Sequence, residues 1–319
     1  MIEKRLFVHA AFLTLAPILV AWFGLSVPAA ILVVLLFLLW RWVVVLSGFL
    51  APEKTPDLIL STISASHFVE KVRWSMDRLG LEYTEQVSGG ALGAFFVGRT
   101  VPQLKMRTGG VQSSIGNSAE ILRYLWGRYV ADDPKAAAFL EPTRARVEFE
   151  SRLDRYGVSL QVWVYYHLLD DRALTLHAWG ANNPATPLWQ RQLLKPLFPI
   201  LRFLIRKSFR ITDANYALAV TRIETLLEEA NRWLGDGRVS LLGGDELNYT
   251  DFAFAAMTGL WLMPAGYGGG RAENVRIERQ RAPAGMREDV ESWETSYADV
   301  VRFVERLYKE ERKIQEGDK

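Results

Sequence analysis

The spacing of apolar residues changes twice along the chain and divides it into three segments. The first, residues 1–52, is almost continuously apolar and carries one formal charge, Arg41, between Leu6 and Pro52. In residues 56–132, short apolar runs alternate with stretches of helical period, and residues 143–319 show helical period alone. We therefore expect a membrane anchor, a mixed α/β domain and an all-helical domain.

The apolar segment predicts a transmembrane helical hairpin. It is far longer than the ~20 residues that one bilayer span requires. A turn-like break from Gly24 to Pro28 separates two arms, Leu6–Phe23 and Ala29–Leu46, and each arm is close to one bilayer thickness. A cleaved signal peptide and a hairpin that enters only one leaflet are the alternatives.

The charges that flank the hairpin predict its orientation. Lys4 and Arg5 precede the first arm, Lys54 follows the second, and the turn between the arms carries no charge. By the positive-inside rule, both ends of the hairpin face the cytoplasm. We expect the remainder of the chain to be a membrane-bound domain on the cytoplasmic side.

Residues 56–132 alternate between strand and helix signals. Gly80 marks the end of the first helix, and Gly109-Gly110 marks the turn of a hairpin. The expected elements are strand Leu58–Thr62, helix Phe68–Leu79, strand Glu82–Val87, a short helix within Ser88–Gly98, strands Pro102–Met106 and Val111–Ser114, and helix Asn117–Tyr129. Their order is β-α-β-(α)-β-β-α.

The remaining helices are expected in the third segment. Asn248 followed by Asp251 has the form of a helix-capping box. The candidate helices are Thr143–Leu169, Leu188–Phe209, Asp213–Leu234, Tyr249–Leu262 and Arg287–Glu311.

The amino-acid composition argues against several classes of function. The 38 basic and 36 acidic residues nearly cancel, which gives no reason to expect a nucleic-acid partner. The chain has no cysteine, so it has neither disulfides nor a cysteine nucleophile. Its four histidines are not at metal-ligand spacing, and we expect no metal site.

Three motifs occur in a fixed order within residues 56–132. They are Ser64-Ala-Ser66-His67-Phe-Val-Glu-Lys-Val-Arg-Trp, then Val101-Pro102-Gln-Leu, then Gly-Asn117-Ser118-Ala-Glu-Ile-Leu. Together they resemble the glutathione S-transferase family, in which a thioredoxin-like domain precedes an all-α domain. The resemblance spans roughly residues 58–311, and it is more specific in the first domain than in the second.

The resemblance implies a role for the first motif in catalysis. Ser66 takes the catalytic position of the serine- and cysteine-type classes. We also expect Ser64 and His67 to contact glutathione, and His67 stands where many relatives carry proline. A hydroxyl at a helix N-terminus can donate to a thiolate, and the helix dipole stabilises the same anion. The alternative for either serine is plain helix capping. For His67 it is a partly exposed side chain without a role.

The other two motifs are implied to hold glutathione. In the family, a cis-proline like Pro102 shapes the start of the third strand, and the backbone of the residue at Val101 pairs with the cysteinyl part. Ser118 and its predecessor bind the γ-glutamyl end. Asn117 stands where relatives carry an acidic residue or glutamine, so it cannot pair ionically with the ligand's ammonium.

The resemblance therefore implies a serine-type glutathione transferase with glutathione as co-substrate. Its second substrate would be an apolar electrophile or a peroxide, and relatives usually form homodimers. The alternative function is a non-catalytic, membrane-tethered binding or scaffold protein of the same fold.

Three further features bear on the surface and the cleft. Leu188–Arg210 carries six basic residues and no acidic one, which predicts contact with anionic lipid or a core helix with a basic face. Pro196 and Pro199 predict a break or a kink in its first half. Gly266–Gly270 predicts a mobile loop at the mouth of the cleft. The aromatic residues Trp163, Tyr165 and Tyr166 line an acceptor pocket or belong to the core.

Overall fold

The computed structural model describes residues 24, 26–49, 55–90, 92, 101–108 and 111–312. The chain divides into two compact units. One contains the described residues up to Ile59 together with Lys105–Ser114, and the other contains the described residues of Leu60–Leu104 and those from Ile115 onward. All the candidate site residues belong to the second unit. The domain boundaries expected at residues 56–132 and 143–319 stay predictions.

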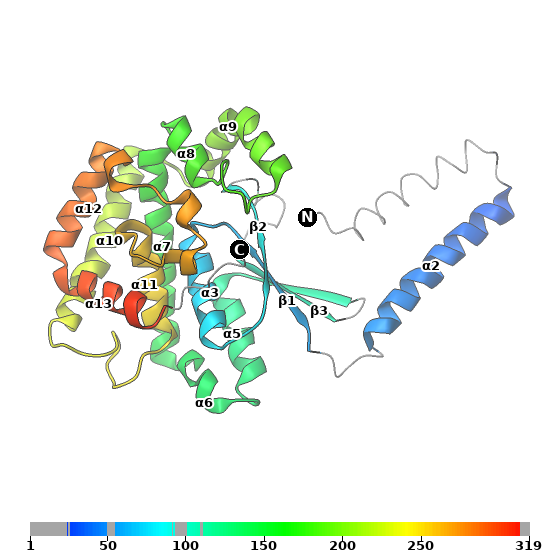
Figure 1. Ribbon diagram of the computed structural model, residues 1–319, viewed down its shortest axis with the longest axis horizontal. Helices are drawn as coiled ribbons and strands as arrows, with labels where there is room; N and C mark the ends of the chain where they lie inside the picture. The colour runs from blue at the N-terminus through cyan, green and yellow to red at the C-terminus, as the bar shows by residue number, and fades with distance from the viewer. Residues whose placement is uncertain are drawn as a thin grey trace. The chain divides into compact units, whose positions relative to one another are not determined.

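A four-stranded sheet has the order β2-β1-β3-β4 (Figure 1). Helix α3 follows β1, and helix α5 follows β4, so the predicted order of strands and helices is confirmed for the described residues. The bounds are β1 Asp57–Thr62, α3 His67–Arg78, β2 Thr84–Val87, β3 Gln103–Thr108, β4 Val111–Gly116 and α5 Ser118–Tyr129. Most of the expected short helix within Ser88–Gly98, and the Gly109-Gly110 turn, lie outside the described residues.

The direction of the strands follows from their connections. Strands β3 and β4 are neighbours joined by two residues, which only an antiparallel pair permits. Asp57, at the start of β1, forms an ion pair of 3.4 Å with Arg107, near the end of β3, so these strands are also antiparallel. The end of β1, the start of β3 and the end of β4 therefore share one edge of the sheet.

The rest of the described chain is helical. Helix α11 is buried along almost its whole length and packs against α3, α7 and α13 (Figure 1). The α-helices are α6 Pro134–Ala137, α7 Arg144–Leu168, α8 Arg172–Ala178, α9 Leu188–Ser208, α10 Asp213–Leu234, α11 Tyr249–Leu262, α12 Ala284–Ser296 and α13 Ala298–Glu310. Short 3₁₀ turns are η1 Ala138–Leu140, η2 Tyr267–Gly270, η3 Glu273–Val275 and η4 Arg279–Arg281.

Two expectations about the helices need correction. The helix expected over Arg287–Glu311 is divided into α12 and α13, because Tyr297 between them has a non-helical backbone. Of the break or kink expected from the two prolines of α9, the break is absent, because the helix is continuous from Leu188 to Ser208. Pro199 has no N–H for the carbonyl of Lys195, and Arg172 donates to that oxygen at 3.0 Å instead.

The capping box at the start of α11 is confirmed. The side chain of Asn248 accepts a backbone hydrogen bond, and Asp251 accepts one from the Asn248 backbone at 2.8 Å. Asp251 also accepts from Leu241 N and Ser240 Oγ, both at 2.8 Å. This buried carboxylate therefore fixes the preceding loop onto the central helix of the domain.

The second arm of the predicted hairpin is helical. It lies in α2, Val27–Phe49, which leaves large apolar side chains such as Leu32, Leu39 and Trp42 exposed. Within the described ranges, no helix combines the length and apolarity needed to cross a bilayer. The first arm, Leu6–Phe23, lies outside the described residues, and the predicted transmembrane hairpin is not supported.

Candidate functional site

The loop between β1 and α3 carries the first motif, and groups from three other parts of the chain hold it. Arg73 donates to the backbone carbonyl of Ser64 at 3.1 Å. The hydroxyl of Tyr267 donates to the carbonyl of Ala65 at 3.3 Å, and the amide of Asn183 donates to Ser64 Oγ at 3.0 Å. Ser64 itself is buried. The loop conformation is thus fixed by Arg73 of the same motif and by two residues from distant parts of the chain, Asn183 and Tyr267.

Ser66 is the N-cap of α3. Its Oγ accepts from Val69 N at 3.4 Å, and its carbonyl accepts from Glu70 N at 2.9 Å. The side chain is half-buried. The capping bond uses a lone pair of Ser66 Oγ, so the hydroxyl proton can still be donated to an anion at this helix start. Capping and a contact with a thiolate are therefore compatible roles for one hydroxyl.

His67 is more enclosed than the sequence indicates. Only 2% of it is exposed, so the expectation of a partly exposed side chain is wrong. Its Nε2 lies 3.0 Å from the carbonyl oxygen of Gly157, as in a neutral ring that donates to this acceptor. Burial lowers the pKa of His67 to about 4, and the hydrogen bond with Gly157 opposes only part of that effect. Its role beside a ligand stays a prediction.

The second and third motifs meet at the sheet edge that also carries Ser66. The bond between Val101 and Pro102 is cis, as the motif predicts, and it precedes β3. Asn117 follows β4 and caps α5 by accepting from Ala119 N at 2.9 Å. Its backbone, with φ 70° and ψ 130°, is unusual for a residue with a side chain, and such strain collects at functional sites. Ser118 beside it is buried.

Buried ion pairs connect α3 to β2 and α7. Arg73 binds the carboxylate of Glu85 through Nε at 2.7 Å and Nη2 at 3.0 Å. Lys71 Nζ lies 2.7 Å from Glu150 of α7, and both side chains are buried. The Lys-Val-Arg step of the motif therefore stabilises the structure. Arg73 holds the loop and β2 against α3, and Lys71 holds α7 against it.

A cavity of about 580 Å³ begins beside Ala65. Val164, Leu168, Trp261 and Met286 give it apolar walls from α7, α11 and α12. Its rim is charged, with Glu273, Arg276, Glu278, Arg279 and Arg287. Ala65 is the neighbour of Ser66 in the chain, and it is the residue of the β1–α3 loop that lines this cavity.

The aromatic residues considered for an acceptor pocket are not among the residues that line this cavity. Trp163 is fully buried and donates to Asp289 at 2.7 Å, which places it in the core. Tyr166 stacks on Tyr216 with ring centroids 3.9 Å apart. Tyr165 packs against a separate apolar cluster under α9.

Three residues that hold the site have no signal in the local sequence. Gly157 sits in the middle of α7 because a side chain there would meet the ring of Phe68 at 2.7 Å. Asn183 lies in a turn, where it also accepts from Ala185 N at 3.0 Å. Tyr267 belongs to the glycine-rich segment, which is packed against α3 and largely buried, so the expectation of a mobile loop is wrong.

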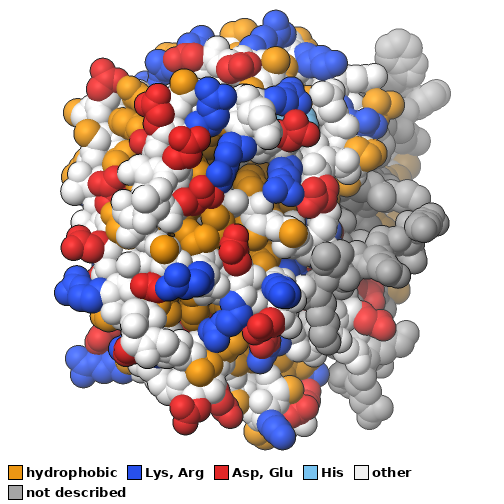
Figure 2. Space-filling model, turned by 60° about the vertical axis from the view of Figure 1, so that its left-hand side comes forward, with side chains coloured by type: hydrophobic (Ala, Val, Ile, Leu, Met, Phe, Trp, Pro, Cys, Tyr) orange, Lys and Arg blue, Asp and Glu red, His pale blue; other side chains and the backbone are white. Residues whose placement is uncertain are grey.

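No group of histidine, cysteine or acidic side chains in the described part of the chain is arranged to hold a metal ion. Over much of the face shown in Figure 2, acidic and basic side chains alternate with apolar ones.

Comparison with known proteins finds distant likenesses among solved structures. No family model and no curated protein matches the chain. A glutathione S-transferase from Methylobacterium radiotolerans, in complex with glutathione sulfonate, is 18% identical with a TM-score of 0.47, over 82% of this chain and 98% of that one. The theta class glutathione S-transferase from Xanthomonas axonopodis pv. citri, with glutathione bound, is 18% identical with a TM-score of 0.37, over 78% and 97%.

Ure2p in complex with glutathione is a further likeness, 13% identical with a TM-score of 0.39, over 81% of this chain and 97% of that one. Values this low describe a distant similarity of structure. What the chain binds has to be inferred from its own sheet edge and cavity.

Proposed function

We propose that this chain binds a low-molecular-weight thiol, glutathione or a similar one, and activates it for transfer to a second substrate. The observation that carries the proposal is the convergence of three motifs at one sheet edge. Each motif contributes one feature to this edge: the start of α3 capped by Ser66, the cis peptide bond before Pro102, and the start of α5 at Asn117 with its strained backbone. Two helix N-termini at one edge favour an anionic ligand.

Ser66 is the proposed activating residue. Its hydroxyl donates a hydrogen bond to the thiol sulfur, and the N-terminus of α3 adds the positive end of a helix dipole. Both stabilise the thiolate relative to the thiol, which lowers the thiol's pKa in the way that helix N-termini lower that of cysteine. The thiolate sulfur then forms a bond to an electrophilic carbon, and the leaving group departs with its electron pair.

Ser118 and Val101 are the proposed holders of the thiol. Ser118 and the first backbone N–H groups of α5 suit the carboxylate at the γ-glutamyl end. The Val101 backbone precedes β3 at the same edge and suits an extended peptide. Asn117 offers an amide but no negative charge, so we expect weaker binding of the ligand's ammonium than an acidic residue would give.

The cavity beside Ala65 is the proposed acceptor site. Its apolar walls favour an apolar electrophile or hydroperoxide, and its charged rim faces the mouth. Holding the acceptor against a bound thiolate raises the effective concentration of both reactants, which is the larger of the two catalytic effects expected here. Homodimer formation stays a prediction.

Isothermal titration of glutathione into the full chain tests the proposal. We expect millimolar or tighter binding that Ser118→Ala weakens about tenfold. Ser66→Ala should leave affinity largely intact but raise the pKa of the bound thiol, followed by thiolate absorbance. Ser151→Ala is the matched control, because that hydroxyl lies on the exposed side of α7 and bonds only to the Val147 carbonyl. An absence of heat at several millimolar glutathione, in folded protein, would overturn the proposal.

A binding or scaffold module is the second candidate. The neutral Asn117 favours it, since the ligand is then held without its usual ionic partner. Thiol binding without any turnover of a chloroaromatic electrophile or of cumene hydroperoxide would select this candidate over the enzyme.

We also propose that the chain is attached to a membrane, with its sheet and helical parts in the cytoplasm. The 23-residue α2 with its exposed apolar side chains supports attachment, and the flanking basic residues support the orientation. Membrane fractionation followed by protease accessibility of intact and opened cells tests both parts. Recovery in the soluble fraction would contradict attachment.

A further inference from the structure

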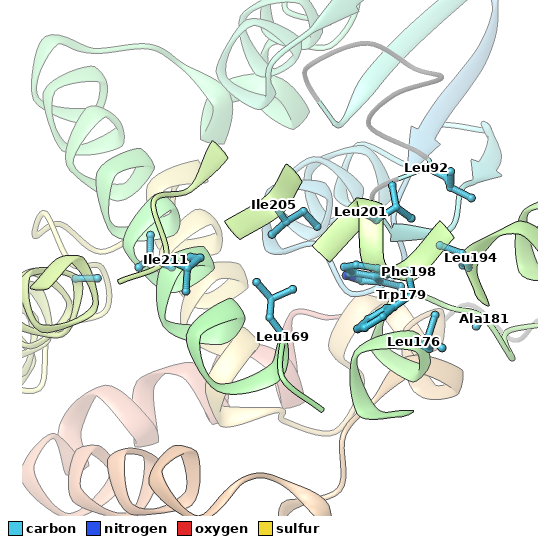
Figure 3. Close-up of a cluster of buried hydrophobic side chains, with 12 residues drawn as sticks. Leu92, Leu169, Leu176, Trp179, Ala181, Leu194, Phe198, Leu201, Ile205 and Ile211 are labelled. Atoms are coloured by element: carbon cyan, nitrogen blue, oxygen red, sulfur yellow. The ribbon is translucent and has the colours of Figure 1, made fainter. Parts of the chain in front are cut away.

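Helix α9 packs one face into the protein and leaves the opposite face outward. Figure 3 shows Phe198 beside Trp179 and Leu176, in a cluster of buried apolar side chains to which Leu194 and Leu201 also belong. Ile200 and Phe203 lie on the other side of the helix and are 59% and 62% exposed. Large apolar side chains so exposed on an already packed helix indicate a surface that contacts something else.

Basic side chains surround these apolar residues. Between Leu188 and Arg210 the chain has six basic residues and no acidic one, which departs from the mixed charge seen in Figure 2. Arg202 and Arg206 share Asp170 as an ion-pair partner, so part of that charge is neutralised. Lys207 and Arg210 are exposed and extend the basic surface to the end of the helix.

An open groove continues this surface onto α10. Its volume is about 750 Å³. Among the described residues, its lining has three basic side chains and no acidic one: Phe203, Arg206, Lys207, Arg210, Ile211, Thr212, Ala214, Asn215 and Leu218. The groove therefore combines apolar walls with positive charge.

We propose that this face of α9, with the α9–α10 groove, binds the surface of an anionic phospholipid bilayer. Basic residues around a strip of large apolar side chains complement negative headgroups above an acyl layer. The backbone of α9 is also compatible with contact to a bilayer at Lys195. Pro199 cannot donate to the Lys195 carbonyl, but Arg172 donates a hydrogen bond to it instead.

A single labelled cysteine can report on α9 alone, because the chain has no cysteine of its own. Ile200→Cys in the full chain, coupled to an environment-sensitive fluorophore, is mixed with vesicles of phosphatidylglycerol and phosphatidylcholine. Val158→Cys is the matched control, since it is an apolar residue on α7 that is 49% exposed. We expect a blue shift at position 200 and none at position 158.

The shift should depend on charge. It should vanish near 1 M salt, where the Debye length is about 3 Å, and it should be small with phosphatidylcholine alone. Lys207→Glu should weaken the partition of the α9 reporter about tenfold, whereas Arg222→Glu, an exposed cation on α10, should not.

Three results would overturn the proposal. The first is sedimentation of the chain with anionic vesicles without a change at position 200, which would assign membrane binding to another segment. The second is an equal response to neutral and anionic vesicles. The third is a reporter at position 200 that ignores vesicles but responds to an acidic amphipathic peptide, which would assign the groove to a protein partner instead.

Discussion

Arg73 donates to the carbonyl oxygen of Ser64 at 3.1 Å while its other nitrogens bind the carboxylate of Glu85. One guanidinium therefore joins α3, the loop before it and β2. Since Ser66 lies two residues beyond Ser64, the position of the candidate catalytic hydroxyl depends on this cation. Arg73 is a positioning residue, because it acts on the site through the loop.

Arg73→Ala should reduce both stability and thiol binding. The substitution removes the nearer of two cations beside the largely buried carboxylate of Glu85. Arg271 Nε remains 3.4 Å away, so the loss in the free energy of unfolding should stay below the value of about 3–5 kcal/mol for a carboxylate left unpaired. Urea denaturation measures this effect, and Arg144→Ala is the control. Arg144 pairs with Glu148 on an exposed helix surface, where loss of a pair costs about 0–1 kcal/mol. Equal losses in the two variants would contradict the assignment.

His67 should make stability fall in mildly acidic solution. Burial lowers its pKa from 6.5 to about 4 in the folded chain, so the unfolded chain takes up the proton first as the pH decreases. Stability is then fully present above about pH 6.5 and is lost between there and about pH 4, by about 3 kcal/mol. Urea denaturation at several pH values should give a flatter profile for His67→Gln. Identical slopes would show that His67 has the same pKa in the folded and the unfolded chain, which contradicts the effect of burial.

Gly157→Ala should destabilise the chain although alanine is the better helix former. Its Cβ would meet the Phe68 ring at 2.7 Å and His67 Nε2 at 3.1 Å, and such overpacking costs about 1–3 kcal/mol. Gly127→Ala is the matched control in α5, where a Cβ meets nothing within 4 Å. That control should gain up to about 1 kcal/mol from helix propensity. A stabilised Gly157→Ala would mean that α7 and the start of α3 lie further apart.

Asn117→Gly should raise the free energy of unfolding, and the gain measures the backbone strain that the folded chain carries at Asn117. Glycine adopts φ 70° without strain, whereas strain of this kind costs about 1–3 kcal/mol, and loss of the amide cap costs only a few tenths. Thermal unfolding measures the gain, and titration of glutathione should show weaker binding in the same variant. A destabilised variant would indicate that the amide of Asn117 does more than cap α5.

The local sequence determines the elements and their chemistry. Three features can be predicted from a few neighbouring residues each: a hydroxyl that caps a helix start, the Val101-Pro102 step and the capping box at Asn248. In the structure they are helix caps and a cis peptide bond. The strand order and the shared sheet edge come instead from strand pairing in the tertiary structure, where the ion pair of Asp57 with Arg107 fixes the direction of β1 against β3.

Only the tertiary structure determines which residues of the first motif are buried and hydrogen-bonded within the fold. His67, Ser64 and Ala65 are bound by Gly157, Asn183 and Tyr267, which lie 90, 119 and 202 residues further along the chain. A histidine or a serine has the same local pattern whether it faces solvent or a distant carbonyl. Its burial, and with it the pKa of His67, depends on which helices pack over the loop, and that packing is a property of the whole chain.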